Sequence, residues 1–359
     1  MPTAVCWSLS WGANHVELIN LSSDTATKPT DGMRAFMARA EVGDEQRRED
    51  PTVNALQDLV AEMTGKEAAL FLPSGTMCNM IALTVQCRRG DAVVVDRGSH
   101  VNTAEAGGPA IHAGVLLRTI DGDRGVFTPD QIRDEVTPAG THTSRTAMVS
   151  VENTTNRGGG KIWSLERLAE IRAVAAETGM VVHMDGARLM NAVVGGGHTA
   201  AEFAGYADTV WIDLSKGLGA PVGAVLAGTA DFIEEARRYK HIFGGAMRQA
   251  GVIAAAGLYA FEHHVERLAE DHENCRVLEA GLAQIPTVDL VRGPVETNIL
   301  FLDVSRTGKS SGQVCEELEA KGVRMSAYPD PRTVRAVTHL DVTRADCERA
   351  VDLVREVCA

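Results

Sequence analysis

The chain has 359 residues, of which 45% are hydrophobic and 23% charged, and its formal net charge is −13. This length allows one large and one smaller domain, and the acidic balance argues against non-specific nucleic-acid binding. Seven cysteines without regular spacing form neither a disulfide framework nor a zinc site, and no apolar run is long enough to span a membrane. We therefore expect a cytoplasmic protein with no metal, no nucleic-acid partner and no membrane contact.

Three segments are expected along the chain. Residues 1–18 lack the basic start and apolar core of a secretory signal, and are expected to be an N-terminal extension. In the first two thirds of the chain, apolar runs alternate with helical patterns, which is typical of a doubly wound α/β domain with a mainly parallel sheet. We assign residues 19–250 to this large domain, with an N-terminal arm, and residues 251–359 to a smaller α+β domain.

Two helices are expected before the sheet begins. Asp31 is expected to cap a helix over residues 32–40, and Thr52 to start a second helix over residues 53–64. Between these helices, residues 42–51 form a charged loop with no helical or strand period.

A candidate anion site follows the first strand of the large domain. Residues 68–72 form an apolar run, after which Ser74, Gly75 and Thr76 begin a helix. Backbone N–H groups and hydroxyls converge at such a helix start, where the helix dipole is positive. An ordinary N-cap is the alternative interpretation. The cofactor chemistry suggested by later strands favours a phosphate site.

His100 follows the next apolar run, residues 92–96. A single histidine after a strand is more often structural than catalytic. This histidine, however, is expected at the same carboxyl edge of the sheet as the other candidates. That position favours a role in stacking on an aromatic cofactor ring.

Two later apolar runs end in the residues that an enzyme dependent on pyridoxal 5'-phosphate (PLP) needs. Residues 180–184 lead to Asp185, and residues 209–214 lead to Lys216 on a tight turn. Ligands bind at the carboxyl ends of parallel strands. A lysine amine forms the Schiff base with PLP, and an aspartate carboxylate keeps the pyridine nitrogen protonated. A helix cap or a surface lysine is the simpler interpretation of either residue alone, whereas the pair predicts a PLP site.

Ordered sequence blocks from about residue 19 to the C-terminus resemble the low-specificity L-threonine aldolases, a family of PLP enzymes of fold type I. The blocks are Ser23-Asp24-Thr25, Glu49-Asp50-Pro51-Thr52-Val53-Asn54, Leu72-Pro73-Ser74-Gly75-Thr76, Glu152-Asn153-Thr154, His183-Met184-Asp185-Gly186-Ala187-Arg188, Leu214-Ser215-Lys216-Gly217-Leu218-Gly219, Met247-Arg248-Gln249 and Val337-Thr338-His339-Leu340-Asp341-Val342. The resemblance implies a PLP-dependent transferase-like fold. It also implies retro-aldol cleavage of L-threonine, L-allo-threonine or other L-β-hydroxy-α-amino acids to glycine and an aldehyde.

The resemblance also assigns a role to each candidate residue. Lys216 would form the Schiff base, Asp185 would pair with the pyridinium, and His100 would stack on the ring. Further cofactor contacts would come from Ser74, Gly75, Thr76, Arg188, Ser215 and, in a neighbouring subunit, Arg248. The substrate carboxylate would be bound by Ser23, Arg188 and Arg335.

The identity of the catalytic base stays open between two histidines. His142 falls at the family's second active-site histidine, and either His142 or His100 would take the β-hydroxyl proton, directly or through water. The resemblance further implies a homo-oligomer, either a dimer or a tetramer, whose subunits share active sites.

Two positions depart from the family's usual pattern. Arg47 and Arg48 stand where Tyr-Gly is usual, and Ala104 stands where an aromatic residue is usual. A larger pocket with added positive charge predicts a bulky or anionic aldehyde partner in place of acetaldehyde. The alternative is that Arg47 and Arg48 are solvated and that the space at Ala104 is filled by other residues.

Other functions would use the same central pair. A PLP-dependent β-eliminating lyase, a racemase or a transaminase also needs Lys216 and Asp185, but acts on a different bond at Cα. A non-catalytic PLP-binding protein would not need the arginines assigned to the substrate carboxylate. Release of glycine and aldehyde, without ammonia or keto acid, distinguishes the aldolase.

Overall fold

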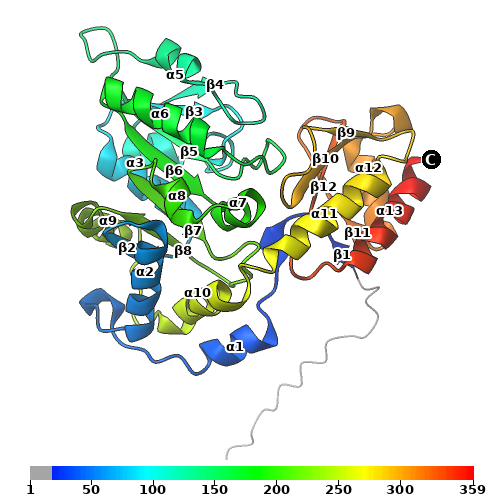
Figure 1. Cartoon of the computed structure of the whole chain (residues 1–359), viewed down its shortest axis with the longest axis horizontal. Coiled ribbons are helices and arrows are strands. Elements are labelled where there is room, and N and C mark those ends of the chain that lie inside the picture. The colour runs from blue at the N-terminus through cyan, green and yellow to red at the C-terminus, as the bar shows by residue number, and fades with distance from the viewer. Residues whose placement is uncertain (1–17) are drawn as a thin grey trace, which may run out of the picture.

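A seven-stranded sheet forms the centre of the larger of two units in the computed structural model, which describes residues 18–359 (Figure 1). Its strands are β2 (Ala68–Leu72), β3 (Ala92–Asp96), β4 (Leu116–Ile120), β5 (Thr146–Glu152), β6 (Val181–Gly186), β7 (Thr209–Asp213) and β8 (Ala224–Gly228). They lie in the order β2-β8-β7-β6-β5-β3-β4, and β8 runs antiparallel to both of its neighbours. The predicted α/β fold with a mainly parallel sheet is confirmed.

Helices cover both faces of this sheet. They are α2 (Pro51–Thr64), α3 (Gly75–Gln86), α4 (His100–Thr103), α5 (Pro129–Glu135), α6 (Leu165–Thr178), α7 (Leu189–Gly196), α8 (Ala200–Ala204) and α9 (Ala230–Ile242). Alternate side chains of a strand point to opposite faces. In β2, Ala69 and Phe71 therefore join the core beneath α2 and α6, while Leu70 and Leu72 pack with α3 and α9. Burial on both faces explains why the sequences of these strands are continuous apolar runs.

The smaller unit is an antiparallel sheet packed against three helices. Its elements are β9 (Asp289–Val291), β10 (Ile299–Asp303), β12 (Ser326–Ala327), β13 (Thr333–Val337), α11 (Leu268–Leu282), α12 (Ser311–Ala320) and α13 (Arg344–Cys358). The strand order is β12-β13-β10-β9. None of the helices in residues 18–359 is both long enough and apolar enough to cross a membrane.

Two segments pack outside the domain to which the sequence assigned them. β1 (Ile19–Asn20) pairs with β11 (Val323–Arg324), and Leu21 is buried in the core of the smaller unit. In contrast, α10 (Gly251–His263) packs against α1 (Asp31–Met37) and α2 of the larger unit. The division into two domains remains a prediction. Its boundaries at residues 19 and 250 do not coincide with the points at which the chain passes from one unit to the other. The predicted extension lies outside the described residues, apart from Leu18.

The starts of the first two long helices differ from prediction by one or two residues. Thr30, not Asp31, caps α1 by accepting a hydrogen bond from the N–H of Met33. Asp50 caps α2 by accepting from the N–H of Val53 at 3.0 Å, with proline as the first helical residue. A capping side chain lies just before the first helical residue, where it reaches N–H groups that have no helical partner.

Candidate active site

Asp185 is the penultimate residue of β6 and lies beside Trp211 of the parallel strand β7. Its carboxylate is buried and accepts hydrogen bonds from the Nδ2 of Asn79, at 2.9 Å, and from the N–H of Ala187, at 3.1 Å. Within residues 18–359, no cation lies within ion-pair distance of Asp185. A buried carboxylate without a cation is costly, so this site favours a ligand that carries a positive charge.

Lys216 lies three residues beyond the end of β7, in a turn organised by Asp213. The Lys216 Nζ is 2.6 Å from Asp213 Oδ2, and both side chains are largely buried. The other oxygen of Asp213 accepts hydrogen bonds from the N–H and the hydroxyl of Ser215, both at 2.8 Å. Asp213 thus fixes the turn and holds the lysine amine in the site. Sequence reasoning missed this residue, although a charged residue in an otherwise apolar strand was a signal.

The start of α3 reaches the same region through Trp211. Ser74 caps the helix by accepting from the N–H of Met77. A Cβ atom on Gly75 would overlap the Trp211 indole, and that indole lies 5.6 Å from the Lys216 Nζ. The first turn of α3, including Thr76, therefore offers unpaired N–H groups beside the indole that Lys216 also approaches.

His100 begins α4 and belongs to a network of buried acidic groups. Its Nδ1 lies 2.8 Å from Glu105 Oε1, and its N–H donates to Glu152 at 2.6 Å. The hydrogen bond to Glu105 raises the pKa of His100 above its ordinary value, and the nearby Asp185 charge adds to this effect. Burial, together with the charge of Asp185, raises the pKa of Glu152 to about 7.

Asn79 of α3 connects this network to the centre of the site. Its Nδ2 donates to both Glu105 and Asp185, while its Oδ1 accepts from the indole N–H of Trp211 at 2.8 Å. The ring of His183 completes the set, 3.1 Å from the same oxygen. Sequence reasoning missed Asn79, although a buried amide on an otherwise apolar helix face was a signal.

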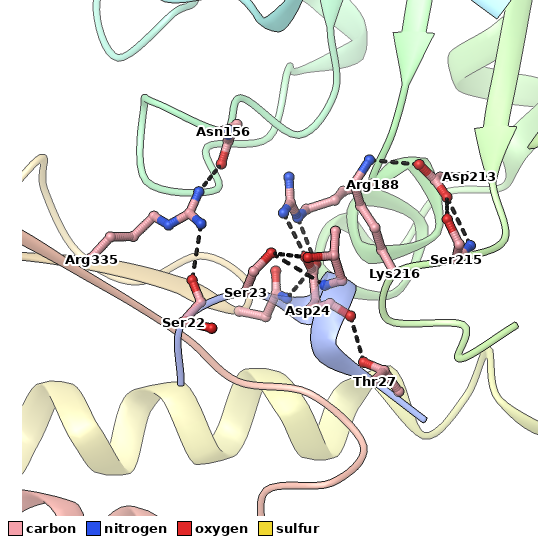
Figure 2. Close-up of polar contacts among 12 residues, drawn as sticks. Ser22, Ser23, Asp24, Thr27, Asn156, Arg188, Asp213, Ser215, Lys216 and Arg335 are labelled. Carbon is pink, nitrogen blue, oxygen red and sulfur yellow. Dashed lines mark hydrogen bonds and ion pairs between the residues drawn. The ribbon is translucent and has the colours of Figure 1, made fainter. Parts of the chain in front are cut away.

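Arg188 already has a carboxylate partner in its own chain. Its Nε and Nη2 donate to the two oxygens of Asp24, each at 2.7 Å, and both side chains are buried (Figure 2). Burial alone would raise the pKa of Asp24, but the Arg188 guanidinium holds it well below its usual range. The edge of the guanidinium formed by Nε and Nη2 is therefore occupied by Asp24. The predicted contacts of Arg188 with the cofactor and the substrate remain predictions.

Ser23 and Arg335 meet from the two ends of the chain. Ser23 caps the short 3-10 helix Asp24–Ala26, and Arg335 lies on β13, across the Ser22–Asp24 segment from Lys216 (Figure 2). Arg335 donates to Asn156 Oδ1 at 2.9 Å and to the carbonyl oxygen of Ser22 at 3.0 Å. Its buried Nε has no acceptor, so part of this guanidinium is left for a ligand.

Two predicted residues are not brought to this site within one chain. His142 lies in an exposed loop before the start of β5, whereas Glu152 lies at its end. The seven-residue strand separates these positions by roughly 20 Å, at about 3.3 Å per residue. Arg248 lies on the surface after α9 and donates to Asp44 at 2.9 Å. A role for His142 or Arg248 in a neighbouring subunit's site remains a prediction.

The residues present fit PLP. The site supplies a lysine amine, a buried carboxylate without a cationic partner, and a helix start with a free hydroxyl and free N–H groups. These groups match the aldehyde, the pyridine nitrogen and the phosphate of that cofactor, respectively. Within residues 18–359, no cluster of side chains suits a metal ion.

Comparison with known proteins agrees with this geometry. The family model described as beta-eliminating lyase matches residues 20–306. The low-specificity L-threonine aldolase of Escherichia coli (strain K12) is 42% identical over 328 residues, which cover 91% of this chain and 95% of that protein. A probable low-specificity L-threonine aldolase 2 of Arabidopsis thaliana is 38% identical, covering 95% of this chain and 98% of that protein.

A solved structure confirms the fold. The Leishmania major threonine aldolase superposes with a TM-score of 0.82 at 22% sequence identity, covering 95% of this chain and all of that one. The family match and the relatives above together cover nearly the whole described chain. This chain belongs to the low-specificity L-threonine aldolases within the beta-eliminating lyase family.

Proposed function

We propose that this protein binds PLP through Lys216 and cleaves L-β-hydroxy-α-amino acids, including L-threonine and L-allo-threonine, to glycine and an aldehyde. The observation that carries the proposal is that a buried Asp185 without a cationic partner and a largely buried Lys216 lie at the carboxyl ends of the adjacent parallel strands β6 and β7. Relatives named low-specificity L-threonine aldolase support the same reaction.

Each group of the cofactor has a partner in this proposal. Lys216 would hold PLP covalently, Asp185 would keep a proton on the pyridine nitrogen, and His100 would stack on the ring. Ser74, Gly75, Thr76 and Ser215 would hold the phosphate. When bound, PLP supplies the electron sink that accepts the pair released from the Cα–Cβ bond.

Arg335 and Ser23 would fix the carboxylate of the substrate. The buried Nε of Arg335 has no acceptor in the described chain, and a carboxylate would supply one. A fixed carboxylate sets the rotation about Cα, and thereby decides which bond is broken. The ion pair between Asp24 and Arg188 would support this arrangement, because it anchors the segment that carries Ser23.

His100 would take the proton of the β-hydroxyl. Its Nδ1 faces Glu105, so that Nε2 is left to act as a base. Asn79 links Glu105 to Asp185 and thereby couples the base to the cofactor site. Within one chain, His100 is the better placed of the two predicted histidines.

Incubation with L-threonine, L-allo-threonine and phenylserine tests the proposal. Purified protein with PLP is expected to release glycine and aldehyde in equal amounts, without ammonia or keto acid. Borohydride reduction should attach the cofactor to the peptide that contains Lys216, as measured by mass spectrometry.

Two variants separate a specific loss from general damage. Lys216→Ala should abolish both the attachment and the cleavage. Lys321→Ala removes an exposed lysine that pairs with Glu356 on the smaller unit, and should retain both. Ammonia and keto acid in place of glycine and aldehyde would instead identify an eliminating lyase.

A further inference from the structure

Three arginines gather near one tyrosine at the boundary between the two units. Arg157 follows β5, Arg292 lies in the turn after β9, and Arg335 lies on β13. The guanidinium carbons of Arg157 and Arg292 are 5.4 and 5.1 Å from the centre of the Tyr328 ring. Residues from distant parts of the chain thus place positive charges close together; we call these three residues the arginine cluster.

In the described part of the chain the arginine cluster has no direct ion-pair partner, although the nearby charges of Asp330 and Asp24 act to raise the pKa of Arg292 and of Arg335, respectively. Within residues 18–359, no carboxylate lies within ion-pair distance of any of the three guanidinium groups. By contrast, two neighbouring arginines are paired: Arg97 with Asp121 at 2.6 Å and Arg124 with Glu296 at 2.7 Å. Unpaired cations held together repel one another, so an anion that binds among them is stabilised.

Hydrogen bonds also leave donors free in the arginine cluster. The side chain of Arg157 makes no hydrogen bond with the described chain, while Arg292 donates to the carbonyl oxygen of Arg157 and stacks over Phe301 at 3.9 Å. Burial lowers the pKa of Arg292 and of Arg335; the charge of Arg188 lowers that of Arg335 further, and the charge of Arg157 makes a smaller contribution to both. The free donors and the mutual repulsion both favour the binding of an anion.

An open cavity of about 410 Å³ gives a ligand access to Arg157 and Arg292. Glycines form much of its wall, including Gly98, which lies two residues before His100. The two carboxylates at the cavity are already engaged, since Asp121 pairs with Arg97 and Asp96 accepts from the N–H groups of Gly98 and Gly122. The cavity therefore presents its positive groups to a ligand.

A narrow crevice of about 10 Å³ adjoins this cavity and touches the catalytic network. It shares Arg157 and Gly98 with the cavity and is also lined by Glu152. Glu152 is the residue that accepts a hydrogen bond from the N–H of His100. Arg335, proposed above to bind the substrate carboxylate, is held by Asn156, the residue before Arg157. Arg157 is thus next in sequence to a residue of the substrate-carboxylate site.

We propose that Arg157 and Arg292 bind a second carboxylate, carried by the side chain of the substrate, while Arg335 binds the first. The inference rests on the proposed function and specifies its substrate class: dicarboxylic L-β-hydroxy-α-amino acids such as 3-hydroxyaspartate. The Cα–Cβ bond breaks, the hydroxyl gives up its proton, and Cα gains one. The products are glycine and glyoxylate, and no other reactant is needed.

The positive charge predicted from the sequence comes from different residues in this proposal. Arg47 is exposed, and Arg48 pairs with Glu234 through both carboxylate oxygens. Neither arginine contacts a candidate site residue of its own chain among these interactions. Arg157 and Arg292, which sequence reasoning did not single out, supply the charge.

The test compares kcat/KM for L-3-hydroxyaspartate and L-threonine in the PLP-bound enzyme. The wild type is expected to prefer 3-hydroxyaspartate. Arg157→Met keeps the apolar stem and breaks no side-chain hydrogen bond, so it should fold. It should lower the ratio of the two kcat/KM values by on the order of 10- to 100-fold, the effect of losing a charge-assisted hydrogen bond.

Three further variants complete the test, of which the first is a control. Arg97→Met removes a guanidinium that lines the same cavity but is paired with Asp121, and should leave the ratio unchanged. Arg292→Lys keeps the charge but loses the planar donor pair, and should lower the ratio by a smaller factor than Arg292→Met.

The outcomes distinguish this inference from the proposed function. Cleavage of threonine with no preference for 3-hydroxyaspartate, and no change of the ratio in Arg157→Met, would overturn the inference alone. Failure to form glycine from any substrate would overturn the proposed function. If inorganic phosphate alters threonine cleavage in the wild type but not in Arg157→Met, without any preference for 3-hydroxyaspartate, the cluster binds a free anion and the substrate assignment is wrong.

Discussion

Single residues in this site act through their charged neighbours. Glu105 holds the ring of His100 through Nδ1, and this hydrogen bond raises the pKa of His100. The raised pKa means that the histidine keeps its proton to a higher pH than an isolated imidazole. A base must first lose that proton, so the same interaction that orients the ring also moves the pH at which the ring becomes active.

Replacement of Glu105 by Gln keeps a hydrogen-bond acceptor but removes the charge. Because the charge favours protonated His100, the pKa of His100 should fall and the base should persist to lower pH. We expect the acidic limb of the kcat/KM profile to move down by about one pH unit. The measurement is a pH profile of glycine release. The control is Glu319→Gln, because Glu319 forms an exposed ion pair with Arg324 on the smaller unit. An unmoved limb would assign the base elsewhere, for example to Glu152.

At the level of secondary-structure elements, the start of α3 is the most constrained feature of the site. The helix begins against the Trp211 indole, which is fixed by its hydrogen bond to Asn79 of the same helix. Only a residue without a side chain allows this approach, so Gly75 brings the first turn of α3 to the end of β7. The predicted phosphate site depends on that approach.

Gly75→Ala should therefore weaken cofactor binding. The added methyl group overlaps the indole, so the indole and the start of α3 must move apart. We expect the free energy of unfolding to fall by about 1–3 kcal/mol and the Kd for PLP to rise. Gly196→Ala is the matched control, because Gly196 is helical and its added methyl group would lie 3.5 Å from the nearest atom. Fluorescence titration with PLP and thermal unfolding measure both effects. Equal behaviour of the two variants would contradict this role of Gly75.

At the level of the whole molecule, the site is assembled from both units. Lys216 and His100 belong to the larger unit and Arg335 to the smaller one, while Ser23 and Asp24 lie on the segment that leads from β1 into the 3-10 helix Asp24–Ala26, between the two units (Figures 1 and 2). Asp24 is held by Arg188 on one side and by Asn298 of the smaller unit on the other. A change in the relative position of the units therefore changes the distance between the substrate carboxylate and the cofactor.

Exposed Arg248 provides a test of whether subunits share sites. If Arg248 completes a neighbouring subunit's site, Lys216→Ala and Arg248→Ala are inactive alone but complement each other when mixed. Random dimers should recover about a quarter of the wild-type activity, because half of the dimers are hybrids and each hybrid has one intact site. Light scattering measures the oligomeric state in parallel. If Arg248 acts in its own chain, no hybrid has an intact site and the mixture stays inactive.

The sequence alone determined the features that depend on neighbouring residues in the chain. Apolar runs predicted the strands of the sheet. The positions of Asp185, Lys216, His100 and the start of α3, just after such runs, predicted that they form the site. This works because strands buried on both faces must be apolar, while ligands bind where those strands end. The ordered sequence blocks then resemble the family that the comparisons confirm.

Only the tertiary structure decided which side chains meet. Asp24 lies 164 residues from Arg188, and Asn79 lies 106 residues from Asp185, so no local pattern could reveal either pair. Arg157 and Arg335 are likewise distant in sequence but close in space. His142 shows the reverse: it is near β5 in sequence, but it precedes the strand, whereas the site residues follow it. Hydrogen bonds and ion pairs act over a few ångströms in space, and the fold, not the chain order, sets that separation.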